Sequence, residues 1–299
     1  MRVFVTGATG WVGSVVVREL LGAGHQVVGL ARSDASAAAL TSAGAEVRRG
    51  SLDDVDGLRE ATAAADGVVH TAFKHDFSDF EAGARADLAP VTAMGEALAG
   101  SDRPFVIASG TGVRDGGRIA TEDTPHLRFG PASARMASED KLWELAERGV
   151  RTSVVRLPPS VHGEGDKGFV PRLIAIAREK GVSAYVGDGA NRWPAVHRLD
   201  AGHLFRLAVE HARPGTALHA VGDEGVPARE IATVIGRHLG VPVSSIPADQ
   251  AADHFGFLGF VFSADLPASG DLTRKWLEWS PTQPGLLADL EAGHYFGEA

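Results

Sequence analysis

The chain has 299 residues, of which 44% are hydrophobic and 22% are charged, and its formal net charge is −9. This length and composition suit an α/β protein with a sizeable core, and the negative charge argues against binding of a nucleic-acid backbone. The sequence has no cysteine, which excludes disulfides, thiolate catalysis and Cys-based metal sites. No apolar stretch approaches the roughly 20 residues that span a bilayer, and the first residues predict a strand rather than a cleavable signal. We therefore expect a cytoplasmic protein without membrane association.

A glycine-rich loop joins the first predicted strand to the first predicted helix. The apolar run 3–5 predicts a buried strand, and residues 11–21 predict a helix. Between them, Gly7 can take a tight turn, Gly10 lets the backbone approach a pyrophosphate, and Gly13 lets the helix pack against the strand. Free N–H groups and the dipole at the helix start favour a phosphate charge there. The loop residues expected to contact a dinucleotide are Thr6, Gly7, Thr9, Gly10, Trp11, Val12 and Gly13.

With its glycines spaced GxxGxxG, the stretch TGATGWVG resembles the short-chain dehydrogenase/reductase superfamily. The resemblance is to its extended and atypical branches, which are NAD-dependent epimerase/dehydratase-like, and it covers essentially the whole chain. It implies an α/β fold with a doubly wound parallel Rossmann sheet and a small C-terminal substrate lobe. We expect the Rossmann core over residues 1–160, with 194–220 returning to it, and the substrate lobe over 161–193 and 221–299.

The residues after the second predicted strand, 26–31, bear on the choice between NADP and NAD. In NAD-preferring folds an acidic residue at this place binds the adenosine ribose hydroxyls. Here Arg32 and Ser33 follow the strand, and a guanidinium beside a hydroxyl suits a 2′-phosphate. We therefore expect NADP rather than NAD. Asp34 keeps the alternative open, because a shifted loop would bring its carboxylate to the ribose.

The third predicted strand, 47–52, ends where family members often place an Asp-Leu pair in contact with the adenine. This chain has Ser51 and Leu52 there, so Leu52 is expected beside the adenine. The carboxylate contact then falls to Asp53 or is absent. Alternatively, Asp53 is the N-cap of the helix that follows.

The fourth predicted strand, 68–72, resembles the family strand whose end lies behind the nicotinamide ribose. Ligands of such folds bind outside the carboxyl ends of the strands. Lys74 and His75 follow directly and are candidate cofactor or substrate contacts, with a charged surface loop as the alternative. The cofactor contacts expected here are Thr71, Ala72, Phe73 and Lys74.

Strands alternate with helices through the rest of the first half, which predicts parallel pairing. Further strands are expected at 105–108 and 153–157, and helices at 79–98 and 132–148. In the family these two helices often build a dimer interface, so the resemblance implies a possible homodimer.

The catalytic pattern of the family is missing. Reductases of this family use a Ser, a Tyr and a Lys, the last two as Tyr-x-x-x-Lys, and the Tyr carries the proton. Counting back from Arg156 puts Pro131 at the Tyr position and Arg135 at the Lys position. The Ser position falls at Gly110, between Ser109 and Thr111. The only tyrosines, Tyr185 and Tyr295, do not start this motif.

Another group would therefore have to supply the proton. Arg135 keeps a cation for the nicotinamide ribose, but its guanidinium stays protonated and cannot act as the acid. His75, Lys74 and His162 lie on predicted loops expected to face the cleft, and His has the right pKa for this task. The candidate catalytic residues are Ser109, Thr111, Arg135, His75 and His162. The further cofactor contacts are Ser109, Arg135, Pro158, Ser160 and Val161.

Two histidine patterns are expected to carry no chemistry. His197 lies in a segment whose family counterpart often has a His, so we interpret it as structural. The twelve histidines show no HExxH or similar spacing, and we predict no metal.

The leading hypothesis is an NADP(H)-dependent oxidoreductase that moves hydride to or from a C=O, C=N or activated C=C bond of a small organic substrate. Loss of the Tyr matters less where the substrate is already protonated or where water or His supplies the proton. A sugar-type epimerase or dehydratase is one alternative, although its cycle needs the proton carrier that is missing. A non-catalytic NADP(H)-binding regulator is the other.

Overall fold

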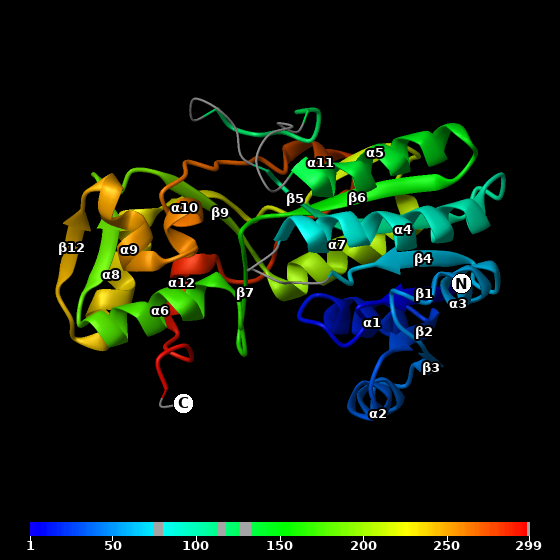
Figure 1. Ribbon diagram of the computed structural model, residues 1–299, viewed down its shortest axis with the longest axis horizontal. Coiled ribbons are helices and arrows are strands. Elements are labelled where there is room, and N and C mark those ends of the chain that lie inside the picture. The colour runs from blue at the N-terminus through cyan, green and yellow to red at the C-terminus, as the bar shows by residue number, and fades with distance from the viewer. Residues whose placement is uncertain (74–79, 113–117, 126–132, 298–299) are drawn as a thin grey trace.

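The computed structural model describes residues 1–73, 80–112, 118–125 and 133–297. It has two parts, a larger one built on a seven-stranded sheet and a smaller C-terminal lobe, with β7 and β9 between them (Figure 1). Among the described helices, none combines the length and the apolar character needed to cross a bilayer.

The large sheet is parallel throughout and has the order β10-β6-β5-β4-β1-β2-β3. The order reverses between β1 and β4, which is the switch point of a doubly wound sheet, where ligands bind. The predicted Rossmann topology is thereby confirmed. The strands are β1 (Arg2–Thr6), β2 (Gln26–Ala31), β3 (Glu46–Arg49), β4 (Gly67–His70), β5 (Pro104–Gly110), β6 (Arg151–Leu157) and β10 (Thr216–His219).

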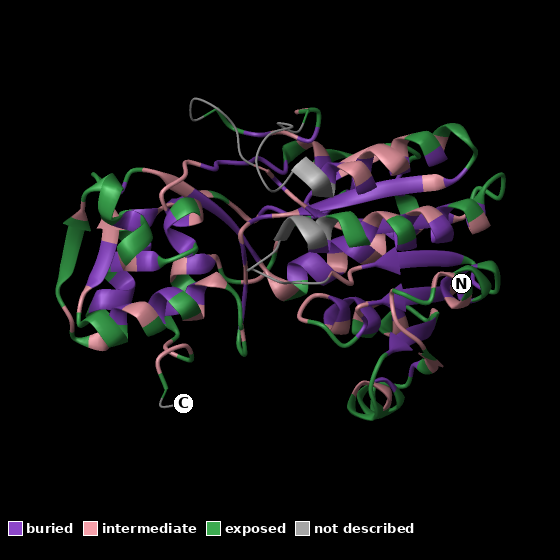
Figure 2. Cartoon of the chain, in the orientation of Figure 1, coloured by how far each residue is buried: buried purple, intermediate pink, exposed green. Residues whose placement is uncertain are grey.

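Helices cover both faces of this sheet because its strands are apolar on both sides. On β1, Val3 and Val5 face one hydrophobic core, and Phe4 faces the other. The first core is closed by α1 (Gly13–Gly22), α2 (Asp34–Ser42) and α7 (Arg198–His211). The second is closed by α3 (Val55–Ala63), α4 (Phe80–Leu98) and α5 (Ser133–Glu147). The strands are accordingly buried, and exposed residues lie on the outer sides of the helices (Figure 2).

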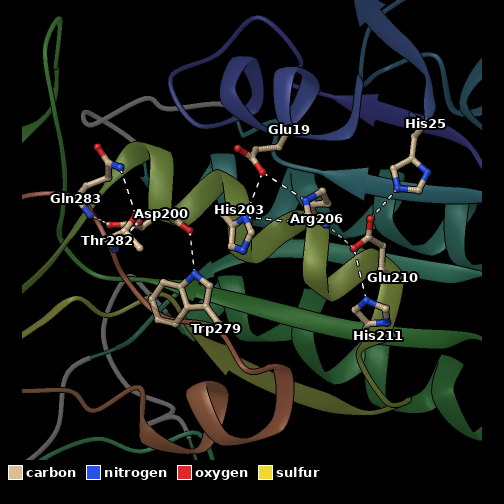
Figure 3. A network of polar contacts seen from close by, with 10 residues as sticks. All are labelled: Glu19, His25, Asp200, His203, Arg206, Glu210, His211, Trp279, Thr282 and Gln283. Atoms are coloured by element: carbon tan, nitrogen blue, oxygen red, sulfur yellow. Dashed lines mark hydrogen bonds and ion pairs between the residues drawn. The ribbon is translucent and has the colours of Figure 1, made fainter. Parts of the chain in front are cut away.

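A polar network joins α7 to α1 outside the first core (Figure 3). Glu19 of α1 accepts from His203 and Arg206 of α7, at 3.2 and 3.4 Å. Arg206 also bonds Glu210 at 2.8 Å, and His25 contacts the other oxygen of Glu210 at 2.8 Å. These contacts fix the middle and the end of α7 relative to the helix that follows the glycine loop.

The lobe has its own core and two small sheets. One sheet has the order β11-β9-β7, with β7 parallel to β9, and the other pairs β12 with β8. The strands are β7 (Ser160–His162), β8 (Ser183–Val186), β9 (Arg192–His197), β11 (Asp223–Pro227) and β12 (Val243–Ile246). The helices are α6 (Phe169–Lys180), α8 (Ala228–Leu239), the 3₁₀ helix η2 (Ala248–Gln250), α9 (Ala251–Phe255), α10 (Leu258–Phe262) and α12 (Leu286–Glu291).

One stretch that we expected in the lobe packs on the Rossmann part instead. Leu277, at the end of α11 (Asp271–Leu277), and Trp279 belong to the core beneath α7. The Trp279 indole N–H donates to the carbonyl of Asp200 in the first turn of α7, at 3.1 Å. The chain therefore leaves the lobe for the Rossmann part and returns to it at α12, which adds two crossings to those that the sequence suggested.

Candidate functional site

The glycine loop forms a backbone cradle at the carboxyl ends of β1 and β4. Gly7 has φ +67°, and a Cβ there would lie 2.5 Å from the backbone nitrogen of Ala72. A Cβ on Gly13 would lie 2.1 Å from the Gly7 carbonyl oxygen, which accepts from the Gly10 N–H at 2.8 Å. Helix α1 then begins without a side-chain cap, and the Ser14 and Val15 N–H groups donate to the Gly10 and Val12 carbonyls, each at 3.0 Å. This cradle fits the pyrophosphate of a dinucleotide.

The end of β4 closes the cradle. Thr71 donates its hydroxyl to the Thr6 carbonyl at 2.9 Å, and Ala72 lies against Gly7. Strand β4 ends at His70, before the predicted limit at residue 72, although the Thr71 N–H still donates to the Thr6 carbonyl at 3.2 Å. Phe73 is the last described residue before a gap, and Lys74 and His75 lie outside the described residues.

Beyond the cradle, cationic and hydroxyl side chains gather where an adenosine ribose would lie. Arg32 is exposed directly after β2. Ser33 is the N-cap of α2 and accepts from the Ser36 N–H at 3.2 Å, and its hydroxyl lies 3.0 Å from that of Ser36. Asp34, the alternative ribose ligand, is ion-paired with Arg49 at the end of β3. Sequence reasoning missed Ser36 and Arg49, although Arg49 ends the strand beside β2, and ends of parallel neighbours share one sheet edge.

At the expected adenine end of the site, the N-cap of α3 is not the residue that we predicted. The N-cap of α3 is Asp54, whose carboxylate accepts from the Gly57 N–H at 3.0 Å, so the N-cap interpretation of Asp53 is wrong by one residue. Asp53 is exposed, and its N–H donates to the Ser51 hydroxyl at 3.2 Å. Leu52 is half-buried and packs against the core under α3.

A buried polar chain that the sequence did not reveal links the cradle to α4 and α5. The His70 ring contacts the Thr6 hydroxyl through Nδ1 at 2.6 Å and the Asp87 carboxylate through Nε2 at 2.9 Å. Ser138 of α5 donates to the other oxygen of Asp87 at 2.9 Å. A carboxylate only accepts, so Nε2 carries a proton and donates to Asp87. The chain fixes α5 relative to the glycine-loop strand.

Helix α5 carries the Lys position of the missing catalytic motif. Pro131 lies outside the described residues, and Arg135 is in α5 with its side chain undescribed. At the end of β5, Ser109 is 3% exposed, and its Oγ has no hydrogen-bond partner among the described residues. Thr111 is also buried, and its N–H donates to the Leu157 carbonyl at 3.0 Å. Ser109 is thus a buried hydroxyl available at the expected edge of the sheet.

The segment after β6 reaches the glycine loop. Pro158 and Ser160 are buried, and the Val161 carbonyl accepts from the Trp11 indole N–H at 2.7 Å. The Arg198 guanidinium lies 3.7 Å from the centre of the Trp11 ring and donates to the Trp11 carbonyl at 3.0 Å. Trp11 therefore connects the cradle to both β7 and the start of α7.

His162 does not lie on an open loop facing the cleft, and that expectation is corrected. It is on β7, it is fully buried, and its Nδ1 bonds the Asp289 carboxylate of α12 at 2.8 Å. Burial would raise the pKa of Asp289, but the bond from His162 and the neighbouring imidazoles outweigh it and lower that pKa. His162 thus belongs to the junction with the lobe.

The two tyrosines and His197 have structural surroundings. Tyr185 is on β8, and the Tyr295 hydroxyl accepts from the Gly163 N–H at 3.0 Å and lies 3.4 Å from Asp166. Burial raises the pKa of both Tyr295 and Asp166. His197 is the N-cap of α7, where its Nδ1 accepts from the Leu199 N–H at 3.3 Å, in agreement with the structural interpretation.

Comparisons with known proteins agree with this geometry. The model of the NAD dependent epimerase/dehydratase family matches residues 3–221. An uncharacterised protein of Schizosaccharomyces pombe is 48% identical over 99% of this chain and 100% of its own length. One of Saccharomyces cerevisiae is 45% identical over 98% of this chain and 99% of its own.

More distant relatives, 25–28% identical, include a decarboxylating sterol-4-alpha-carboxylate 3-dehydrogenase, a 2-alkyl-3-oxoalkanoate reductase and a UDP-glucose 4-epimerase. The dTDP-glucose 4,6-dehydratase of Streptomyces venezuelae, solved with NAD, shares the fold at a TM-score of 0.78 and 20% identity, covering 99% of this chain and 96% of that one. Such an identity shows the fold alone. The match over residues 3–221, the switch-point cradle and the two close relatives establish that the chain belongs to the NAD-dependent epimerase/dehydratase family.

Proposed function

We propose that the protein is an NADP(H)-dependent oxidoreductase that transfers hydride to or from a C=O, C=N or activated C=C bond of a small organic substrate. The observation that carries the proposal is the charge at the adenosine end of the cradle. Arg32 is exposed there, and Asp34, the acid that we expected as the alternative ribose ligand, forms an exposed ion pair with Arg49. Two guanidiniums beside the hydroxyls of Ser33 and Ser36 suit a 2′-phosphate.

The residues of the cradle would hold the cofactor in a fixed place. The N–H groups at the start of α1 would bind the pyrophosphate, and Thr71 and Ala72 would lie beside the nicotinamide ribose. When bound, the cofactor supplies the hydride chemistry, and the protein supplies position and, where needed, a proton.

The proton is the unusual part of this proposal. Ser109 has a buried hydroxyl without a described partner at the end of β5, so it can orient a substrate heteroatom. His162 is removed from the candidate donors because it is buried and bound to Asp289. A substrate that needs no phenolic acid, such as an iminium or an activated alkene, fits a site without the Tyr-x-x-x-Lys motif. The same lack weighs against an epimerase, whose cycle returns a proton to one oxygen.

Measured affinities for NADPH and NADH test the proposal. Replacing Arg32 with Glu should weaken NADPH binding by about 10- to 100-fold, since a charge-assisted bond to phosphate contributes about 1.5–3 kcal/mol, and should leave NADH within about threefold. Arg49→Glu should act in the same direction. Arg48→Glu is the matched control, because Arg48 is on the same strand but pairs with Glu60 of α3.

Three outcomes would contradict parts of the proposal. Equal losses for NADPH and NADH in Arg32→Glu would refute the 2′-phosphate assignment. Binding of neither cofactor to the wild-type protein would refute the whole proposal. Tight NADPH binding without turnover of any ketone, imine or enone in a broad panel would indicate a non-catalytic regulator instead.

A further inference from the structure

A short strap, residues 163–168, contacts both the glycine loop and the C-terminal segment of the chain. It has the sequence GEGDKG and joins β7 to α6 (Figure 1). On one side, a Cβ on Gly165 would lie 3.8 Å from the ring of Trp11 in the glycine loop. On the other side, the Gly163 N–H donates to the Tyr295 hydroxyl at 3.0 Å. The strap therefore lies between the candidate cofactor cradle and a residue near the end of the chain.

The strap has little to stiffen it from within. Gly163 and Gly165 have φ +140° and +82°, which L side chains rarely adopt, and glycine gives the backbone more freedom than any other residue. Asp166 makes two bonds inside the strap: its N–H donates to the Gly163 carbonyl at 3.1 Å, and its carboxylate accepts from the Gly168 N–H at 2.6 Å. These bonds shape the turn, but contacts with other segments must fix its position.

Tyr295 supplies such contacts. It follows α12, and its ring packs against the lobe core. Its hydroxyl accepts from the Gly163 N–H and lies 3.4 Å from a carboxylate oxygen of Asp166 and 3.4 Å from one of Asp289 in α12. A carboxylate only accepts, so the single phenolic proton bonds one of these two acids at a time. One hydroxyl thus connects two points of the strap to α12.

Trp11 connects the strap to the cradle. Its indole N–H donates at 2.7 Å to the carbonyl of Val161, two residues before the strap begins. A Cβ on Gly163 would lie 3.2 Å from Cγ of Arg198, whose guanidinium lies 3.7 Å from the centre of the Trp11 ring. Two residues after Trp11, the chain begins α1, the helix expected to bind the pyrophosphate. Movement of the strap therefore removes support from a residue of the cofactor loop.

We propose that Tyr295 is a positioning residue for the cofactor: its hydroxyl holds the strap, the strap holds Trp11, and Trp11 keeps the cradle closed on a bound dinucleotide. This inference rests on the proposed function, because it needs a dinucleotide in the cradle. Without the hydroxyl, the strap loses its contacts at Gly163 and Asp166. Changes within one binding site act mostly on the rate of release. The main expected effect is therefore faster dissociation of the dinucleotide.

Tyr295→Phe tests the inference, because it removes the hydroxyl and keeps the ring. Stopped-flow displacement of bound NADPH by excess NADP, followed by fluorescence, should show dissociation about fivefold faster, the effect of one typical hydrogen bond. In the full-length protein without cofactor, the Gly163 amide should exchange its hydrogen about tenfold faster. The Trp11 indole N–H resonance, identified by its loss in Trp11→Phe, should also shift.

The chain offers a matched control for the lost hydroxyl. Tyr185 is the other tyrosine and lies on β8, which pairs with β12. Tyr185→Phe should leave the dissociation rate and the Trp11 resonance unchanged.

A second pair of variants changes the strap itself. Asp166→Ala removes the acceptor of the Gly168 N–H and a partner of Tyr295, so it should also speed dissociation, by about threefold or more. Glu164→Ala is the control, because Glu164 is an exposed residue of the same strap. It should dissociate like the wild type.

The inference is overturned if Tyr295→Phe releases NADPH at the wild-type rate, or if it leaves the Trp11 resonance unchanged. A lower unfolding midpoint with an unchanged dissociation rate would show a merely structural role. If Tyr295→Phe does not fold, Asp166→Ala and Glu164→Ala decide the question, and equal dissociation rates in those two variants overturn the inference. Failure of the proposed function looks different: neither NADPH nor NADH would bind the wild type, and this inference would fall with it.

Discussion

The two sides of β7 are built in different ways. On the side of the glycine loop, the cradle is made mostly by backbone atoms of one short stretch and the end of β4. On the other side, the junction is made by side chains that are distant in the sequence, such as His162 and Asp289, which are 127 residues apart. A backbone cradle leaves a sequence signature because only glycine fits it, whereas side-chain contacts between distant segments leave none.

The same comparison separates affinity from stability. The cradle is built mainly from backbone atoms beside a helix start without a side-chain cap, so changes there should act on binding. The junction groups are buried and bonded to one another, so changes there should act on the free energy of unfolding. Four substitutions test this division.

The largest effect is expected from Gly13→Ala. The new Cβ would lie 2.1 Å from the Gly7 carbonyl oxygen and 2.7 Å from the Thr71 hydroxyl, so the cradle must open. We expect NADPH affinity to fall more than 100-fold, which is about 3 kcal/mol, in a fluorescence titration. Gly22→Ala is the control, because a Cβ at the end of α1 meets nothing within 4 Å. Equal affinities of the two variants would show that the loop does not hold the pyrophosphate.

The sequence predicted the cradle side well because its information is local. Strand, glycine turn and helix follow one another within residues 2–22, and the alternation of Val3, Phe4 and Val5 between two cores suits a buried parallel strand. The predicted first and last residues of strands and helices were less accurate where contacts with other segments determine them. Asp54 rather than Asp53 precedes α3, because its carboxylate reaches the Gly57 N–H.

The second effect concerns the junction and is expected in stability. Asp289→Ala removes the acceptor of the fully buried His162, which should lower the free energy of unfolding by about 2–4 kcal/mol in urea denaturation. Glu291→Ala on the same helix is the control, because its pair with Arg237 is exposed and should contribute about 1 kcal/mol or less. NADPH affinity should change less than threefold in both. A similar loss of stability in the two variants would mean that the buried pair has no special role.

The junction could not have been predicted, and the reason is physical. His162 alone in the sequence resembles any loop histidine, and its burial follows from α12, which closes over β7 from the far end of the chain. The buried contacts of Asp87 with His70 and Ser138 are similar, because they span 17 and 51 residues and follow no motif spacing. Arg49 became a candidate only once β2 and β3 were seen side by side.

The third effect tests Trp11, the residue that joins the two sides. Trp11→Phe keeps a ring under Arg198 but removes the N–H that donates to the Val161 carbonyl. One lost hydrogen bond of about 1 kcal/mol should weaken NADPH binding roughly fivefold and lower stability by a similar amount. Trp276→Phe is the control, since Trp276 is exposed on α11. If only stability changes, Trp11 belongs to the junction and takes no part in holding the cradle.

The smallest effect is a pH dependence at the start of α7. Burial lowers the pKa of His197 below its usual 6.5. Among the charged groups that face the ring, His162 and Arg198 also lower this pKa. Asp289 and Asp200 raise it and offset part of the shift. The folded chain therefore binds fewer protons here than the unfolded chain, so stability is lost as the pH falls through 6.5. His197→Asn keeps an N-cap acceptor for Leu199 but cannot titrate. Between pH 7.5 and 5.5, the wild type should lose more free energy of unfolding than His197→Asn, by less than about 1 kcal/mol because the ring is half-exposed. Both losses are measured by urea denaturation. Identical losses in the two proteins would show that His197 has the same pKa in the folded and the unfolded chain. Any acid sensitivity of the junction would then come from other groups.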